Sequence, residues 1–162
     1  MGYKATIVNA AESMAIIDYL VTPANRHDAS ALVPVLLSME KHGTIAKVGA
    51  FYGDNAFFTV NNEKWLSFYE KECKFHSKEE TGKCPKKRRS AKKKSRVRSR
   101  VESTFGILHK NHHFGRARTR ALPKVTVDAC LIFTSWNHFF MVSYFVDKSK
   151  HRISLRKLFY EN

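Results

Sequence analysis

Cysteine is scarce in this chain, and its few copies are poorly placed for a disulfide framework or a metal site. Cys73, Cys84 and Cys130 are odd in number and form no CxxC pair. This pattern favours reduced thiols in a cytosolic protein. His76 lies between the first two cysteines, but these three residues are only a partial set of zinc ligands. We therefore interpret the cysteines as ordinary thiols.

A leader and a membrane span are also not evident. The first residues of the chain lack the apolar core of a signal peptide. Residues 125–146 are strongly apolar, but Asp128, Asn137 and His138 lie within them. Polar groups at such positions are costly in lipid. The segment therefore predicts a buried helix, and no membrane partner is expected.

Acidic residues are outnumbered two to one, and the imbalance is concentrated in one segment. The chain has 29 Lys and Arg against 14 Asp and Glu, a net charge of +15. Eleven of the basic residues lie between residues 83 and 100, where there is no acid, which leaves +4 for the rest of the chain. A charge this large predicts a polyanionic partner, most commonly nucleic acid. Contact with phosphates is expected rather than readout of base sequence.

The length and hydrophobicity of the chain suit one domain with its own core. It has 162 residues, of which 43% are hydrophobic. The residue pattern predicts strands at 3–9 and 14–22 with a turn at 10–13, a helix ending at Gly43, a strand at 47–53, a helix at 62–73, a short strand near 74–76, a loop at 77–94, and helices at 95–111 and 122–146. This order indicates an α/β fold with a mixed sheet and flanking helices.

The first helix and the third strand carry more detailed expectations. Asp28 or Ser30 is expected to cap the helix, and Pro34 to kink it. The strand at 47–53 is apolar on both alternating faces, which predicts a central strand covered on both sides. Gly53, near its end, would let a backbone or a phosphate come close.

Two acidic residues lie in very different settings. Asp54 directly follows the apolar strand, and ligands of open α/β sheets bind beyond the carboxyl ends of strands. Glu102 lies on the basic helix, at the edge of its apolar face, with Arg98 one turn before it. This pairing is expected of a phosphoryl-transfer enzyme that acts on nucleic acid with Mg²⁺ or Mn²⁺.

Structural roles for the same residues remain open. Asp54 would also cap a turn at Asn55, and Glu102 would also form a solvated pair with an arginine. The chemistry usually needs three carboxylates, and no third is evident. Asp18 falls within a hairpin strand and Asp28 fits a helix cap, so neither is a natural candidate.

Three motifs in this order suggest a family. The string Val21-Thr22-Pro23-Ala24-Asn25-Arg26-His27-Asp28, then Gly53-Asp54-Asn55-Ala56-Phe57, then Arg98 to Glu102 followed by Phe105-Gly106, resembles the C-terminal part of a DDE transposase of bacterial and archaeal insertion sequences. The resemblance covers about residues 3–145. The family's Tyr-x2-Arg-x3-Glu-x6-Lys signature matches at Arg98 and Glu102, with Ser95 in place of Tyr and His109, followed by Lys110, in place of Lys.

The resemblance implies an RNase H-like fold and DNA transposition with Mg²⁺ (or Mn²⁺). Asp54 and Glu102 would be the second and third catalytic carboxylates and metal ligands, supported by Arg98. The family's first catalytic Asp lies on a strand before the one that resembles residues 3–8. The expectation is therefore a partial RNase H-like catalytic domain at 1–147, with a basic loop at 77–94 and a basic C-terminal tail at 148–162.

Such a fragment is expected to be weakly active or inactive alone. Its expected partners are double-stranded DNA at transposon ends, a second polypeptide that supplies the N-terminal part, and further copies of itself joined through an exposed sheet edge. It is expected in the cytoplasm, associated with the nucleoid. DNA contacts are expected from Lys86, Lys87, Arg88, Arg89, Lys92, Lys93, Lys94, Arg96, Arg100, His109, Lys110, Arg116, Arg118 and Arg120.

Two non-enzymatic alternatives fit the composition. The first is a basic nucleic-acid-binding protein that uses the same side chains as a phosphate clamp, with strong salt dependence and no need for Asp54. The second is a small RNA-associated protein of ribosomal type, which would prefer RNA to duplex DNA.

Overall fold

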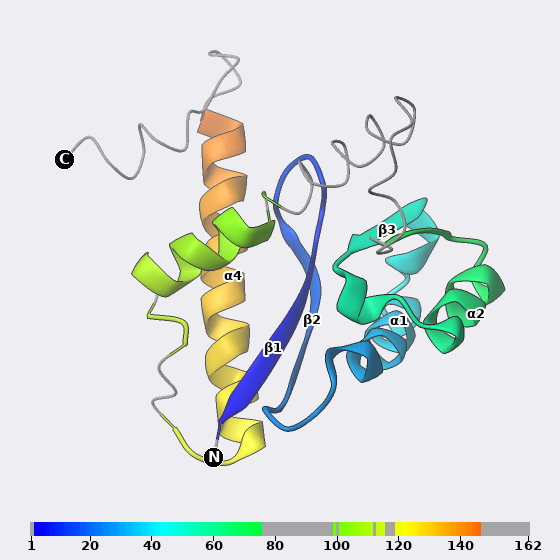
Figure 1. The fold of residues 1–162 in the computed structure, drawn as a ribbon. Coiled ribbons are helices and arrows are strands. Elements are labelled where there is room, and N and C mark those ends of the chain that lie inside the picture. The colour runs from blue at the N-terminus through cyan, green and yellow to red at the C-terminus, as the bar shows by residue number, and fades with distance from the viewer. Residues whose placement is uncertain (1, 76–98, 100, 112, 116–118, 147–162) are drawn as a thin grey trace, which may run out of the picture.

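A computed structural model describes residues 2–75, 99, 101–111, 113–115 and 119–146, without the side chains of residues 143–146 (Figure 1). The expected loop at 77–94, Arg98 and the tail at 148–162 lie outside these residues. The described part is a mixed α/β arrangement, as expected. It contains two separate two-stranded sheets rather than one mixed sheet.

The first sheet is the predicted hairpin. Strands β1 (Tyr3–Asn9) and β2 (Ile16–Pro23) pair antiparallel, with a register shift between Val8 and Asn9. The second strand begins two residues later than predicted. Met14 has a φ of 60°, and its N–H donates to the Ala10 carbonyl oxygen, so the turn extends beyond the expected residues 10–13.

The two faces of the hairpin are covered by different helices. Helix α4 (Leu122–Val146) packs against one face and α1 (Leu32–Lys41) against the other. Alternate side chains of a strand point to opposite faces, so Ile7 joins the α4 core while Val8 joins the α1 core. A two-stranded sheet is marginally stable by itself, and this double cover is what stabilises it.

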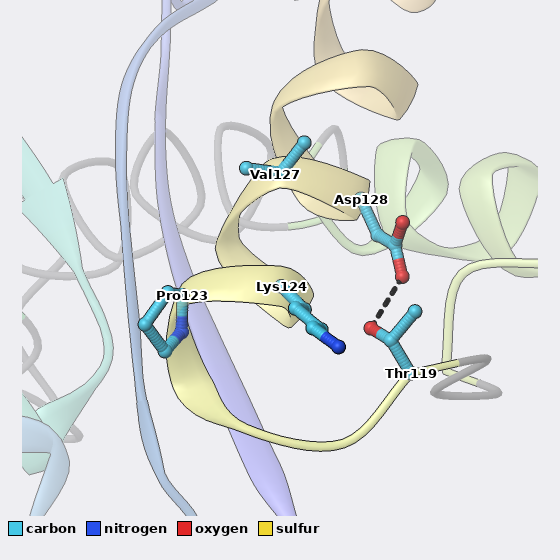
Figure 2. A pocket seen from close by; sticks show the side chains of 5 residues that line it. All are labelled: Thr119, Pro123, Lys124, Val127 and Asp128. Atoms are coloured by element: carbon cyan, nitrogen blue, oxygen red, sulfur yellow. Dashed lines mark hydrogen bonds between the residues drawn. The ribbon is translucent and has the colours of Figure 1, made fainter.

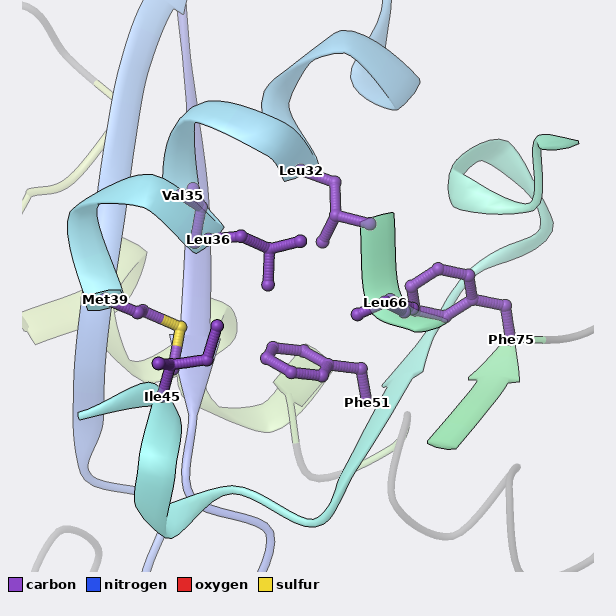
Figure 3. Packing of buried hydrophobic residues seen from close by; sticks show 8 residues of the cluster. All are labelled: Leu32, Val35, Leu36, Met39, Ile45, Phe51, Leu66 and Phe75. Atoms are coloured by element: carbon purple, nitrogen blue, oxygen red, sulfur yellow. The ribbon is translucent and has the colours of Figure 1, made fainter. Parts of the chain in front are cut away.

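The α1 core extends to the second sheet. Its buried residues come from α1, from the turn after it, from both strands of the second sheet and from α2 (Val60–Phe68); they are Leu32, Val35, Leu36, Met39, Ile45, Phe51, Leu66 and Phe75 (Figure 3). Four of them are spaced at helical intervals in α1, which is why that helix forms an apolar stripe toward β2 and β3. The packing of these side chains holds the second sheet beside the hairpin.

The predicted capping of α1 is wrong. A short 3-10 helix, η1 (Asp28–Ala31), precedes α1, and the residue before α1 makes no side-chain cap bond. The Asp28 carboxylate instead pairs with Lys4 Nζ at 2.9 Å, and the Ser30 hydroxyl donates to the His27 carbonyl oxygen at 2.6 Å.

The ends of α1 explain its proline and its glycine. Pro34 is the third residue of α1, and its missing N–H lies in the first turn, so it does not interrupt the helix, which continues to Lys41. Gly43 has a φ of 67° and ends the helix as predicted.

The prediction of a central strand at 47–53 is not met in the described residues. Strand β3 (Ala50–Gly53) is only four residues long, because residues Ile45–Lys47 form a 3-10 turn, η2. It pairs in parallel with β4 (Glu72–Phe75). Within the part of the chain that the structure describes, the other edges of β3 and β1 carry no strand.

Helix α2 connects these parallel strands and is shorter than predicted. Thr59 caps it by accepting the Asn62 N–H at 3.2 Å. The helix ends at Phe68 rather than at Cys73, because Glu70 adopts a φ of 56° and redirects the chain into β4.

Helix α4 is not the buried helix that its composition predicted. Ala129, Phe133 and Trp136 are buried against the hairpin, while Val127 is 58% and Leu131 65% exposed. By length and composition α4 could cross a membrane. Within its most apolar stretch of 18 residues, only 17% is buried inside the protein. The sequence identified the helix and its bounds but not its single buried face.

An amide side chain fastens α4 to the hairpin. Asn137 Oδ1 accepts the Ile16 N–H at 2.9 Å, and its Nδ2 donates to the Ile16 carbonyl oxygen at 2.7 Å. Trp136 Nε1 donates to the carbonyl oxygen of Met14, two residues before β2 begins, at 3.2 Å. These bonds tie α4 to the start of β2 and to the turn before it.

We expect Asn137→Leu to lower the free energy of unfolding by roughly 2–4 kcal/mol, because it removes the hydrogen-bond partner of both the N–H and the carbonyl oxygen of Ile16. Urea unfolding followed by circular dichroism measures this loss. Ser135→Ala, an exposed change on the same helix, is the control and is expected to stay within about 0.5 kcal/mol of wild type. Equal stability of the two variants would contradict a role for the amide.

Burial, reinforced by a hydrogen bond with Cys130, raises the pKa of Tyr19 to about 12. An unfolded tyrosine ionises near pH 10. The stabilisation from the neutral phenol is therefore complete below about pH 10 and is lost as the pH rises toward 12. Thermal unfolding midpoints between pH 9 and 12 should fall more steeply for wild type than for Tyr19→Phe. Identical slopes for the two proteins would contradict this.

Candidate functional site

Asp54 directly follows β3, at the carboxyl end of the strand, as predicted. It is exposed and caps the 3-10 helix η3 (Asn55–Phe57), where its Oδ1 accepts the Asn55 N–H at 2.8 Å. The structural role expected for this residue is therefore confirmed. The bond also orients the carboxylate, because it sets the side chain relative to the turn.

A buried amide holds the turn that follows Asp54. Asn62 is 1% exposed, and its Nδ2 donates to the carbonyl oxygens of Phe57 at 2.9 Å and Ala29 at 3.1 Å. One side chain thus joins η3 to η1, the turn after β2. The sequence pattern did not single out Asn62, since a polar residue in the first turn of a helix is ordinary.

Gly53 leaves room for a ring rather than for a ligand. A Cβ atom at this residue would lie 2.9 Å from Phe75 Cδ1 and 3.6 Å from Phe57 Cδ2. The aromatic side chains therefore occupy the space that the sequence assigned to an approaching backbone or phosphate. Gly53 allows β3 and β4 to keep their register with Phe75 packed in the core beneath Asp54.

Gly53→Ala is expected to lower the free energy of unfolding by roughly 1–3 kcal/mol, because the added methyl group collides with the Phe75 ring. Chemical denaturation measures the change. In the background Phe75→Leu the same glycine substitution should cost less, since a smaller side chain leaves space. Additive losses in the double variant would argue against this contact as the cause.

Glu102 lies on the helix formed by residues 101–111 and is exposed. Thr104 and Leu108 of that helix are fully buried. Thr104 Oγ1 accepts from Asn9 Nδ2 at 3.1 Å, which ties this helix to the end of β1, next to the hairpin turn. Arg98, the expected support of Glu102, lies outside the described residues.

The described contacts do not bring the two carboxylates together. The turn of Asp54 is bonded to η1, beyond the carboxyl end of β2, whereas the turn of Glu102 is bonded to the opposite end of the hairpin. Figure 1 shows the 101–111 helix beside α4, across the hairpin from β3. Among the residues that the structure describes, no three His, Cys, Asp or Glu side chains form a group that could hold a metal.

Three of the predicted DNA contacts can be placed. His109, Lys110 and Arg120 are all exposed. The His109 ring lies edge-on to Phe114, with the ring centroids 5.7 Å apart, and packs over Gly115, whose φ of +107° suits a glycine. The other predicted contacts lie outside the described residues, namely Lys86, Lys87, Arg88, Arg89, Lys92, Lys93, Lys94, Arg96, Arg100, Arg116 and Arg118.

A shallow hollow of about 320 Å³ opens at the start of α4, lined by Thr119, Pro123, Lys124, Val127 and Asp128 (Figure 2). Thr119 Oγ1 donates to Asp128 Oδ2 at 2.8 Å across it. Neither Asp54 nor Glu102 lines this hollow, so it is separate from the predicted carboxylate site.

Residues 1–138 match the family model described as the transposase DDE domain. The chain belongs to this family. The match spans both Asp54 and Glu102 as well as the complete hairpin. No curated protein and no solved structure matches the chain.

The transposase domain assignment confirms the family expected from the three sequence motifs. It connects the chain with DNA transposition and accounts for a net charge of +15 in a protein of this size. The roles of Asp54, Glu102 and the basic side chains remain predictions.

Proposed function

We propose that this transposase domain takes part in DNA strand cleavage and transfer at the ends of an insertion sequence, by metal-dependent phosphoryl transfer. Asp54 and Glu102 would be two of its three catalytic carboxylates. The observation that carries this proposal is the family match over residues 1–138, which includes both residues. Their placement supports it, since Asp54 ends a parallel strand and Glu102 is exposed on a helix.

The chemistry of the two side chains suits Mg²⁺ or Mn²⁺, which prefer carboxylate oxygens. The described residues by themselves do not gather enough donors for such an ion. Asp54 and Glu102 would therefore supply only part of the ligand set. When bound, a divalent ion would supply charge stabilisation at the scissile phosphate and a more acidic water.

A third carboxylate would come from a strand that lies between the two sheets. Each of β1 and β3 has one edge that is paired, and neither has a second partner among the described residues. A strand added there would join the sheets into one RNase H-like sheet and place its own carboxylate between Asp54 and Glu102. We propose that a second polypeptide supplies it, and that the chain alone is weakly active or inactive.

Double-stranded DNA would be held mainly through phosphates. His109, Lys110 and Arg120 lie in one stretch of chain that begins on the helix of Glu102, and all three are exposed. Lysine and arginine contacts of this kind release counterions and make binding strongly salt-dependent. We place this activity in the cytoplasm, in contact with the nucleoid.

The test begins with the DNA upstream of the Met1 codon. If an in-frame or frameshifted segment there encodes a strand with an Asp, its polypeptide would be produced together with this chain. The two would then be assayed for cleavage of DNA that carries the ends of the insertion sequence. With Mg²⁺ present, Asp54→Asn and Glu102→Gln should each lower the cleavage rate by on the order of 100-fold or more. DNA binding by both variants should remain unchanged.

Glu12→Gln, an exposed acid in the hairpin turn, is the matched control and should cleave like wild type. Full cleavage by Asp54→Asn or Glu102→Gln would refute the carboxylate assignment. If DNA binds equally well but is never cut, the chain is a non-catalytic basic nucleic-acid-binding protein. Preference for RNA over duplex DNA would instead support the ribosomal type.

A further inference from the structure

The motif at residues 21–28 has no role in the proposed cleavage step, although it lies next to the turn of Asp54. It comprises the end of β2 and the entry to η1, the 3-10 helix that His27 precedes. η1 is in contact with η3, the helix that Asp54 precedes, and Asn62 donates to one carbonyl oxygen in each of them. Because neither helix exceeds four residues, its first residue lies within about 8 Å of the contact. His27 and Asp54 are therefore neighbours in the fold.

The turn that carries Arg26 and His27 is fixed by hydrogen bonds to its backbone. Lys4 Nζ donates to the Arg26 carbonyl oxygen at 2.9 Å and to Asp28 Oδ1 at 2.9 Å. The His27 carbonyl oxygen accepts the Ser30 hydroxyl at 2.6 Å. Within the part of the chain that the structure describes, no hydrogen bond or ion pair engages the side chain of Arg26 or of His27. The turn therefore holds the backbone and leaves two exposed side chains to a ligand.

The electrostatic balance of this turn favours an anion. Lys4 pairs with Asp28, which cancels the one acidic side chain of the motif and leaves the Arg26 guanidinium as a net positive charge. An ammonium group has three N–H groups, and Lys4 uses two of them within the turn. The guanidinium adds a fork of N–H donors that matches a phosphate, and the imidazole of His27 adds another donor.

A DNA strand at Asp54 needs such a partner. The Asp54 carboxylate and a backbone phosphate are both negative and repel each other, so a fixed positive charge beside them offsets the repulsion and keeps the strand in place. Neither Arg26 nor His27 is among the DNA contacts expected from the sequence. Their position beside Asp54 depends on the contact between η1 and η3, which joins segments about 30 residues apart in the chain.

We propose that Arg26 and His27 form a phosphate clamp, supported by Lys4, that holds the DNA strand beside Asp54. The ligand is a backbone phosphate, and a clamp of this kind reads no base sequence. The clamp rests on the proposed function for the identity of its DNA substrate, and it adds the residues that position the strand for cleavage.

Salt-dependent DNA binding by the full chain tests the clamp. Arg26→Gln removes one phosphate contact, so the slope of log affinity against log salt concentration should become shallower by about 0.9. At about 0.1 M salt, the affinity for a duplex of roughly 20 base pairs should fall about threefold or more. Arg26→Lys should retain most of the slope, since it keeps the charge. Fluorescence anisotropy between about 0.05 and 0.3 M salt measures both quantities.

Lys41→Gln is the matched control. Lys41 is exposed and ends α1, about 15 Å along that helix from η1, so its replacement removes the same charge away from the clamp. Its slope should change by less than half as much. Equal slopes for Arg26→Gln and Lys41→Gln would overturn the proposal. A lower unfolding temperature for Arg26→Gln than for wild type would also count against it, because the turn uses only the Arg26 backbone.

A proximity probe tests where the DNA lies. An iron chelate that cuts DNA through hydroxyl radicals is attached to the thiol of Asn25→Cys or of Lys41→Cys, and wild type labelled at its native cysteines gives the background. Asn25 is exposed and adjoins Arg26. Asn25→Cys should cut bound DNA severalfold above the background, whereas Lys41→Cys should not. Equal cutting by the two variants would overturn the clamp.

Failure of the clamp and failure of the proposed function are distinguishable, since neither measurement requires the protein to cleave DNA. If Arg26→Gln binds with the slope of Lys41→Gln while Asp54→Asn abolishes cleavage, the clamp alone is wrong. If Asp54→Asn cleaves like wild type while Arg26→Gln shows the shallower slope, the clamp stands as a phosphate-binding surface and the carboxylate assignment is wrong.

Discussion

The arrangement of this domain depends on the burial of one two-stranded sheet from both sides. The hairpin of β1 and β2 has too few strands to be stable alone, so each face needs an apolar cover. α4 provides one cover and α1 the other. Because alternate strand residues belong to different cores, a slip of one residue in the β1–β2 register would expose both cores at once.

Two asparagine amides extend this constraint to the remaining elements. Asn137 bonds both backbone groups of Ile16 and so sets the position of α4 along β2. Asn62 bonds the carbonyl oxygens of Ala29 and Phe57 and so sets the turn of Asp54 against the turn after β2. Amide groups suit this work because each can make several hydrogen bonds: Asn137 uses its oxygen and its nitrogen, and Asn62 donates twice from Nδ2. Apolar packing brings the elements together, and the amides define their relative positions.

The two acidic residues of interest are attached to different parts of the described structure. Asp54 follows β3, which packs in the α1 core. Glu102 lies on a helix that is bonded to the end of β1. Both residues lie within the part of the chain that matches the transposase DDE domain. A further strand between the sheets, as proposed, would join them into one sheet and would also bring the third carboxylate.

The sequence by itself determined the elements with a strong local signal. The hairpin followed from two β-rich runs, the end of α1 from Gly43, the bounds of α4 from its long apolar pattern, and the family from three short motifs. Tertiary structure decided what depends on partners distant in the chain: that Asp28 pairs with Lys4 rather than capping a helix, that β3 is short and paired with β4, and that α4 buries one face only. Periodicity records which residues are apolar, but only packing decides which of them meet another element and which remain at the surface.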